Sequence, residues 1–125
     1  MTDQQGLESV LNWISSHFSH LVRSFHDGLD ANGKQITNAT HGFGSFEQTY
    51  ANGEVKTHFQ IGVAATSSGI SIYLLGIRGK LDLPQLCLGL GKAKVTGYCI
   101  SFKNFAALDQ QIFRRVLGET LQLTN

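Results

Sequence analysis

Residues 89–102, "GLGKAKVTGYCISF", combine three glycines, two lysines and a cysteine. A P-loop requires the pattern G-x-x-x-x-G-K-[ST] between a strand and a helix. The hydroxyl of its last residue, a serine or threonine, binds Mg²⁺. Here Ala93 follows Gly91 and Lys92 in place of that hydroxyl, and a strand is predicted next. The stretch is therefore not a nucleoside-triphosphate loop. Lys92 and Lys94 are candidates for binding a phosphate or carboxylate. A solvated basic turn is the alternative interpretation, and such patterns more often indicate it.

Cys99 lies in the predicted strand that ends this stretch, on the face expected to point outward with His58 and Tyr73. A cysteine needs a neighbouring base or cation to become a nucleophile, and no catalytic pattern surrounds this one. Free cysteine usually packs as a small apolar residue, so a passive thiol is favoured over a redox or nucleophilic centre. The sequence also has no Ser-His-Asp order, carboxylate pair or dinucleotide fingerprint. It therefore predicts a protein that is not an enzyme.

Five histidines raise the question of a metal site. His17 and His20 are three residues apart on one predicted helical face. His41 shares a predicted strand face with Glu47, opposite His58. Zinc sites usually show spacings such as H-E-x-x-H or C-x-x-C, and neither pattern occurs in the chain. The sequence therefore predicts no metal ligands and no cofactor.

Trp13 shares the predicted helical face of His17 and His20, and no Lys or Glu accompanies it there. Exposed aromatic residues often mark a contact with a partner, so these three residues are partner-contact candidates. The equally favoured alternative is a Trp13 side chain that the N-terminal tail covers.

The composition indicates one folded domain over residues 1–125, with 42% hydrophobic and 15% charged residues. The net charge of +1 argues against nucleic acid as a partner. Residues 1–77 nevertheless carry a net charge of about −3 and residues 78–125 one of about +4, which predicts a local basic patch. The sequence shows no signal peptide and no bilayer-spanning run. With two cysteines and no disulfide framework, a cytoplasmic protein is expected.

The remaining pattern predicts the elements that position these residues. Apolar spacing predicts a helix over residues 7–25, with its stripe at Leu7, Val10, Leu11, Ile14, Phe18, Leu21, Val22 and Phe25. Asn52-Gly53 predicts a two-residue type I′ turn between strands "HGFGSFEQTY" and "EVKTHFQIGVAAT". That register places Glu47 opposite His58, and Phe46 opposite Phe59.

Further along, Ser67-Ser68-Gly69 predicts a turn into the strand "ISIYLLGI", and a short helix is expected after Pro84. "YCISFK" is predicted to be the last strand, with Cys99, Ser101 and Lys103 outward. Asp109 is the predicted N-cap of a closing helix. The sum is an α+β, two-layer sandwich, in which the N- and C-terminal helices pack on one face of an antiparallel sheet.

The order of three segments resembles the YdhG-like family, catalogued as domain of unknown function 1801. The segments are "HGFGSFEQTYANGE", "QIGVAATSSGISIYLLG" and "LGLGKAKVTGYCISFKNFAALDQQIFRRVL", which together cover about residues 40–120. The positions that fit the family pattern are Gly42-Phe43-Gly44, Leu90-Gly91-Lys92, Lys94, Cys99, Lys103 and Asp109. The resemblance implies a frataxin-like fold, and one branch of the family is described as an intracellular iron chaperone.

These observations favour a small, non-enzymatic binding module for a small ligand or a protein partner. Its ligand-binding candidates are Lys92, Lys94, Glu47, His58, Tyr73, Cys99 and Lys103. The alternative that the resemblance implies is a chaperone that binds iron weakly. No nucleic acid or membrane partner is expected, and a homodimer is left open.

Overall fold

The computed structural model describes residues 3–67, 69–77 and 80–124, with side chains from residue 6 onward. The helical elements are α1 (Asp3–His17), α2 (Leu83–Leu86) and α3 (Gln110–Gln122), with 3₁₀ turns η1 (Leu75–Ile77) and η2 (Phe105–Ala107). The strands are β1 (Arg23–His26), β2 (Thr40–Phe43), β3 (Phe46–Thr49), β4 (Val55–His58), β5 (Ile61–Thr66), β6 (Gly69–Tyr73), β7 (Lys94–Val95) and β8 (Cys99–Phe102). Ser68, in the predicted turn at 67–69, lies outside the described residues.

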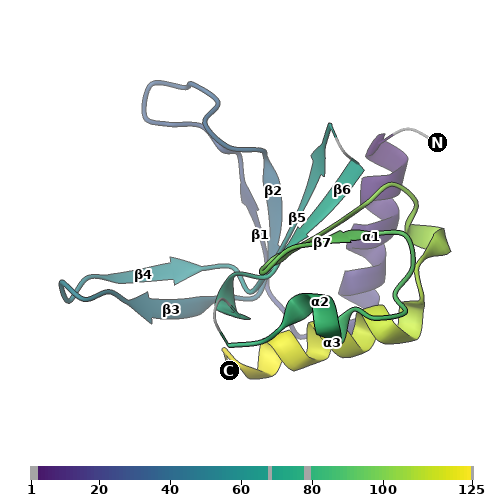
Figure 1. Ribbon diagram of the computed structural model, residues 1–125. Helices are drawn as coiled ribbons and strands as arrows, with labels where there is room; N and C mark the ends of the chain where they lie inside the picture. The colour runs from purple at the N-terminus through teal and green to yellow at the C-terminus, as the bar shows by residue number, and fades with distance from the viewer. Residues whose placement is uncertain (1–2, 68, 78–79, 125) are drawn as a thin grey trace.

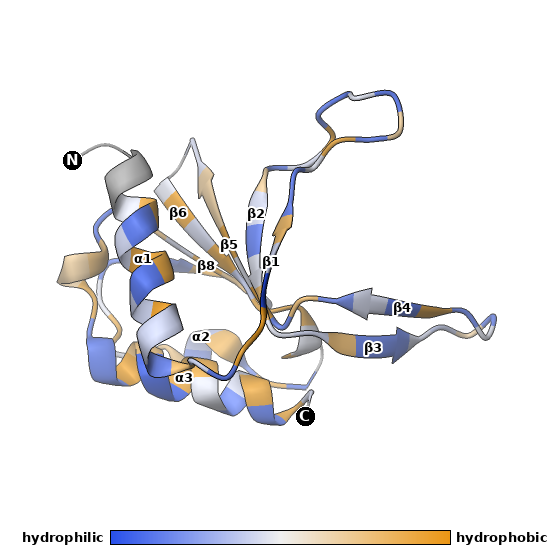
Figure 2. Ribbon diagram, turned by 180° about the vertical axis from the view of Figure 1, so that it is seen from behind, coloured by the Kyte–Doolittle hydropathy of each residue, from blue (hydrophilic) through white to orange (hydrophobic). Residues whose placement is uncertain are grey.

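Six strands form one antiparallel sheet in the order β1-β2-β5-β6-β8-β7, and β3 pairs with β4 in a separate two-stranded sheet. The helices α1 and α3 pack against one face of the large sheet (Figure 1). Both helices carry apolar and polar residues in separate stripes (Figure 2). The predicted α+β fold class is therefore confirmed. None of the described helices is long and apolar enough to cross a bilayer.

The first helix is shorter than the apolar spacing predicts. It ends at His17, and the four residues of β1 pair with β2 instead. The prediction of a helix to residue 25 was therefore wrong, and Val22 and Phe25 are 78% and 59% exposed. Ser15, Ser16 and His17 are poor helix formers, and hydrogen bonding to a neighbouring strand outweighs the weak helical preference that follows.

The central hairpin has a different turn from the one predicted. Gly53 has a φ of +87°, but no described residue other than glycine has a positive φ, whereas a type I′ turn needs positive φ at both central residues. The Gly53 N–H donates to Tyr50 O, and the Tyr50 N–H donates to Glu54 O. The loop therefore has three residues, a type I turn followed by a glycine bulge.

This extra loop residue shifts the register by one position. Phe46 is opposite His58, and Glu47 is opposite Thr57. The predicted Glu47–His58 and Phe46–Phe59 pairs were therefore wrong. Because successive side chains point to opposite faces, a shift of one residue exchanges the two faces.

The predicted long strands are also interrupted, at Gly44–Ser45 and at Phe59–Gln60. The register is nevertheless continuous, since Phe43 pairs with Ile61 below the break and Phe46 with His58 above it. The two strands bend together, and the β3–β4 hairpin projects away from the large sheet (Figure 1). We call this projecting hairpin, residues 46–58, the arm.

The C-terminal elements agree with the sequence predictions. Ile100 and Phe102 are buried, Cys99 and Ser101 alternate with them on the other face of β8, and Lys103 follows the end of the strand. The carboxylate of Asp109 accepts a hydrogen bond from the Ile112 N–H at 3.0 Å, which confirms the N-cap. The short strand β7 has no counterpart among the predicted elements.

Candidate functional site

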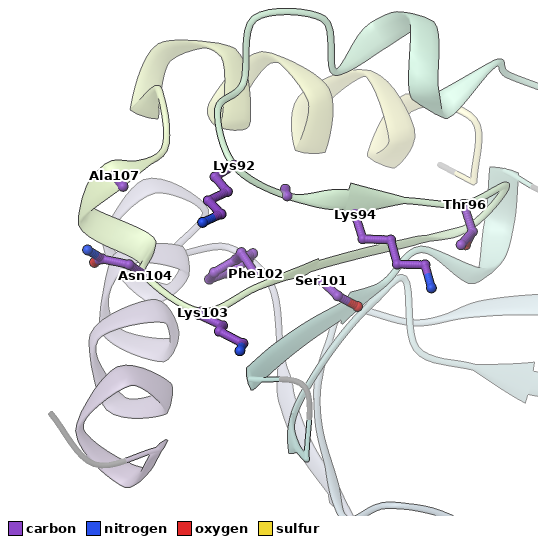
Figure 3. Close-up of a pocket in the computed structure, with 9 residues that line it drawn as sticks. Lys92, Lys94, Thr96, Ser101, Phe102, Lys103, Asn104 and Ala107 are labelled. Atoms are coloured by element: carbon purple, nitrogen blue, oxygen red, sulfur yellow. The ribbon is translucent and has the colours of Figure 1, made fainter.

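A groove with a volume of about 710 Å³ lies beside β7, β8 and η2 (Figure 3). We call it the lysine groove. It is lined by Lys92, Ala93, Lys94, Thr96, Ser101, Phe102, Lys103, Asn104 and Ala107. This volume falls in the range of about 300–1,000 Å³ that is usual for small-ligand sites.

Strand pairing brings the lysines together. Lys94 of β7 pairs directly with Ser101 of β8, so the two side chains project from the same face of the sheet. Lys103 follows β8 two residues after Ser101, and Lys92 precedes β7. Three positively charged side chains from two chain segments therefore line one groove.

The backbone geometry of residues 89–102 favours a glycine at position 91. Gly91 has a φ of +123°, and a Cβ there would lie 3.0 Å from Ala107 O. Next to it, Leu90 O accepts a hydrogen bond from the Asp109 N–H at 2.7 Å. These contacts hold the segment before β7 against the start of α3. Gly97, in contrast, has no heavy atom within 4 Å of a built Cβ, so its neighbours do not require a glycine.

Among the residues that the structure describes, all charged groups that line the lysine groove are positive. Its nine residues include three lysines and neither an aspartate nor a glutamate. Asn104 Oδ1 accepts a hydrogen bond from the Ala106 N–H, which leaves the amide nitrogen as a donor. Ser101 Oγ lies 3.1 Å from Ser71 Oγ and 3.6 Å from Cys99 Sγ. The groove thus offers ammonium, amide and hydroxyl donors to a bound anion.

The seven predicted ligand-binding candidates fall into three groups. Lys92, Lys94 and Lys103 line the lysine groove. Tyr73 and Cys99 pair across β6 and β8, on the sheet face that also bears Ser101. The other two candidates, Glu47 and His58, belong to the arm.

A second cavity, of about 400 Å³, lies between the arm and the body of the protein. We call it the arm cleft, and it is lined by Gln48, Tyr50, His58, Leu75 and Tyr98. The Tyr50 hydroxyl lies 2.9 Å from His58 Nε2 in a hydrogen bond. The Lys56 ammonium lies 5.5 Å from the centre of the Tyr50 ring, a distance at which it attracts the aromatic face.

The predicted contact patch on the first helix is only partly present. Trp13 and His17 stack with ring centres 4.1 Å apart, and the His17 Nδ1–H donates to Trp13 O at 2.8 Å. Trp13 also lies beside the Phe105 and Phe113 rings, so core aromatics cover part of its side chain. His20 follows the end of α1 and does not share the helical face.

The sequence pattern did not indicate Thr96, Ser101 and Asn104 as site residues, nor Tyr50 and Tyr98. Thr96 and Ser101 each lie two residues from a lysine, Lys94 and Lys103, and Asn104 directly follows Lys103, so the period-two spacing around these lysines is an available signal. No sequence pattern indicates the two tyrosines as site residues, because their proximity depends on the bend of the arm.

Among the described residues, two ionisable groups, Cys87 and His41, have clearly shifted pKa values. Burial raises the pKa of the Cys87 thiol to about 11, and the nearby Arg115 opposes this. Burial and then the Arg23 charge lower the pKa of His41, against a smaller opposing effect of Glu8. Neither group lines the lysine groove. In the described part of the chain, no three His, Cys, Asp or Glu side chains gather as a set that could hold a metal ion.

No family model, curated protein or solved structure matches this chain. The resemblance to the YdhG-like family stays a prediction that rests on the sequence segments quoted above.

Proposed function

We propose that this protein is a non-enzymatic binding module whose lysine groove binds a small organic anion. The observation that carries the proposal is the convergence of Lys92, Lys94 and Lys103 on one groove, whose described lining residues include no carboxylate. An anion bound there meets attractive charges and hydrogen-bond donors, and charge-assisted hydrogen bonds are the stronger kind.

The apolar part of the lining supports an organic anion rather than a bare inorganic ion. Ala93, Phe102 and Ala107 share the groove with the lysines. Ligand pockets typically combine such apolar surface with a few polar groups that fix orientation. A small phosphorylated or carboxylated compound fits this combination.

The chemistry of the lining supports binding rather than proton transfer. General acid–base catalysis at neutral pH uses groups with a pKa near 7, most often histidine or a perturbed carboxyl. The lining residues of the lysine groove include neither. Cys99 reaches the groove only through its 3.6 Å contact with Ser101.

In a competing interpretation, the lysines protect the edge of the sheet at β7 from pairing with a strand of another molecule. β7 is the last strand of the sheet and has two residues, and short edge strands with lysines prevent unwanted strand pairing. This interpretation requires no bound anion. The two interpretations therefore differ in the response of the protein to phosphate.

The test is a titration of ¹⁵N-labelled protein with sodium phosphate and, separately, phenyl phosphate at low ionic strength. We expect amide shifts confined to residues 92–107, with tighter binding of phenyl phosphate because of its ring. The double variant Lys92→Gln/Lys94→Gln should weaken both affinities about tenfold, as loss of charged hydrogen bonds predicts.

The matched control is Lys34→Gln/Lys80→Gln, which removes the same charge from two exposed positions outside the groove. It should leave both affinities within about twofold. Equal weakening by the two variants, or no lysine-dependent binding, would overturn the proposal in favour of edge protection.

A further inference from the structure

The arm cleft carries the side chains that commonly recognise a heteroaromatic ring. Tyr50 and Tyr98 supply aromatic surface, and nucleobases stack favourably on aromatic side chains. Gln48 supplies an amide that can both donate and accept hydrogen bonds, as the edge of a nucleobase requires. Leu75 supplies an apolar wall.

The arm cleft adjoins the lysine groove along the chain. Thr96 lines the groove and Tyr98 lines the cleft, with one residue between them. The Thr96 N–H donates to Cys99 O at 2.9 Å, which closes the turn that contains both. Their Cα atoms are thus at most about 7 Å apart. Thr96 lies at the opposite end of the groove from Asn104 and Ala107 (Figure 3).

The two cavities offer complementary chemistry. The lysine groove has positive charge, and the only aromatic ring among its described lining residues is that of the buried Phe102. The arm cleft has two tyrosine rings and an amide, its described lining contains no lysine, and the Lys56 ammonium beside it lies over the Tyr50 ring. A ligand that used both would have an anionic group at one end and a planar ring with polar edges at the other.

We infer that the anion of the proposed function is a nucleoside monophosphate, with its phosphate beside Lys94 at the Thr96 end of the lysine groove (Figure 3) and its base against Tyr98 and Tyr50. This inference rests on the proposed function, because it assigns the phosphate to the same groove. It adds the arm as the part of the protein that recognises the base.

The test compares adenosine 5′-monophosphate with its two halves, adenosine and inorganic phosphate, by amide shifts of ¹⁵N-labelled protein. The nucleotide should shift residues 48–58 and 98 as well as 92–104, and should bind at least tenfold more tightly than phosphate. The gain is expected because the tethered ring then binds at a high effective concentration.

Two variants separate the ring from the charge. Tyr98→Leu should remove most of the gain of the nucleotide over phosphate while it leaves the phosphate affinity within twofold. Phe25→Leu changes an aromatic residue that is 59% exposed on β1, outside both cavities, and should change neither affinity.

The outcomes distinguish this inference from the proposed function. If phosphate binds but the nucleotide binds no more tightly, or if Tyr98→Leu has no effect, the inference is overturned and the proposed function stands. If neither compound binds, both are overturned. Tighter binding of a single-stranded decanucleotide than of the monophosphate, per site and at the same salt concentration, would also overturn the assignment to a small ligand.

Discussion

Asp109 begins the last helix through one hydrogen bond, from the Ile112 N–H to its carboxylate. Removal of such a cap leaves a helical N–H without its partner and costs about 1 kcal/mol. Asp109→Ala should therefore lower the free energy of unfolding by about 1 kcal/mol, as measured by urea denaturation. Asp109→Asn is the matched control, since asparagine also caps, and an equal loss in both variants would contradict the capping role.

His41 reports on the charges around it. Burial and Arg23 lower its pKa from the ordinary value of 6.5, so the unfolded chain takes up the proton first as the pH falls. The contribution of this group to folding stability is therefore present above about pH 6.5 and is lost at lower pH. We expect Arg23→Gln to raise the pKa of His41 and Glu8→Gln to lower it further, as measured by an NMR titration of the ring. Shifts in the opposite directions would contradict this account.

The two cysteines should differ in reactivity. Burial raises the pKa of Cys87 to about 11, so at pH 8 only about one thiol in a thousand is ionised. Cys87 is also 6% exposed, while Cys99 is only partly buried. Iodoacetamide at pH 8 should therefore modify Cys99 first and Cys87 only after unfolding, as peptide mass spectrometry would show. Equal rates in the native protein would contradict this expectation.

At the scale of the element, Gly44 sets the bend that separates the arm from the sheet. Its φ is +72°, and a Cβ there would overlap Gln60 Oε1. Gly53 has a similar φ of +87° but open space around it. Gly53→Ala should therefore cost about 1 kcal/mol from backbone strain alone, and Gly44→Ala at least twice that. Thermal unfolding measures both, and equal costs would mean that the contact with Gln60 is easily relieved.

The elements show where sequence patterns suffice. The stripe from Leu7 to Ile14 and the cap at Asp109 depend on local spacing, and the structure has both. The segment around Val22 and Phe25 also continues the helical spacing, but β1 forms there because β2 offers backbone partners. Local spacing contains no information about a distant strand. The prediction of the hairpin register was wrong for another reason. Asn52-Gly53 suits a two-residue loop and a three-residue loop alike.

At the scale of the whole molecule, the lysine groove should be dispensable for folding. Lys92 and Lys94 are exposed, and substitutions at such positions usually change stability by less than about 0.5 kcal/mol. In urea denaturation, the free energy of unfolding of Lys92→Ala/Lys94→Ala should therefore lie within about 0.5 kcal/mol of that of the unaltered protein. A larger loss would mean that these side chains support the fold, and it would weaken their assignment to a ligand.

The sequence indicated part of the site. The glycine-rich surroundings indicate Lys92 and Lys94, and the outward face of the predicted strand "YCISFK" indicates Lys103. Their convergence depends on β7, which has two residues and too little pattern to predict. Tyr50 and Tyr98 are 48 positions apart in the numbering, and only the bend at Gly44 brings them to one cleft.

The continuous register across that bend makes the arm an exchangeable insert. Phe43 and Ile61 are already paired neighbours in β2 and β5, so an Asn-Gly turn could join them in place of residues 44–60. The shortened chain should still unfold cooperatively, because the insert contributes only Gln60, which is bonded to Thr124, to the buried residues. Arms of other lengths and sequences could be grafted at the same two residues. The sheet would then serve as a constant scaffold, and ligand preference could diverge between descendants of this chain without renewed selection on its core.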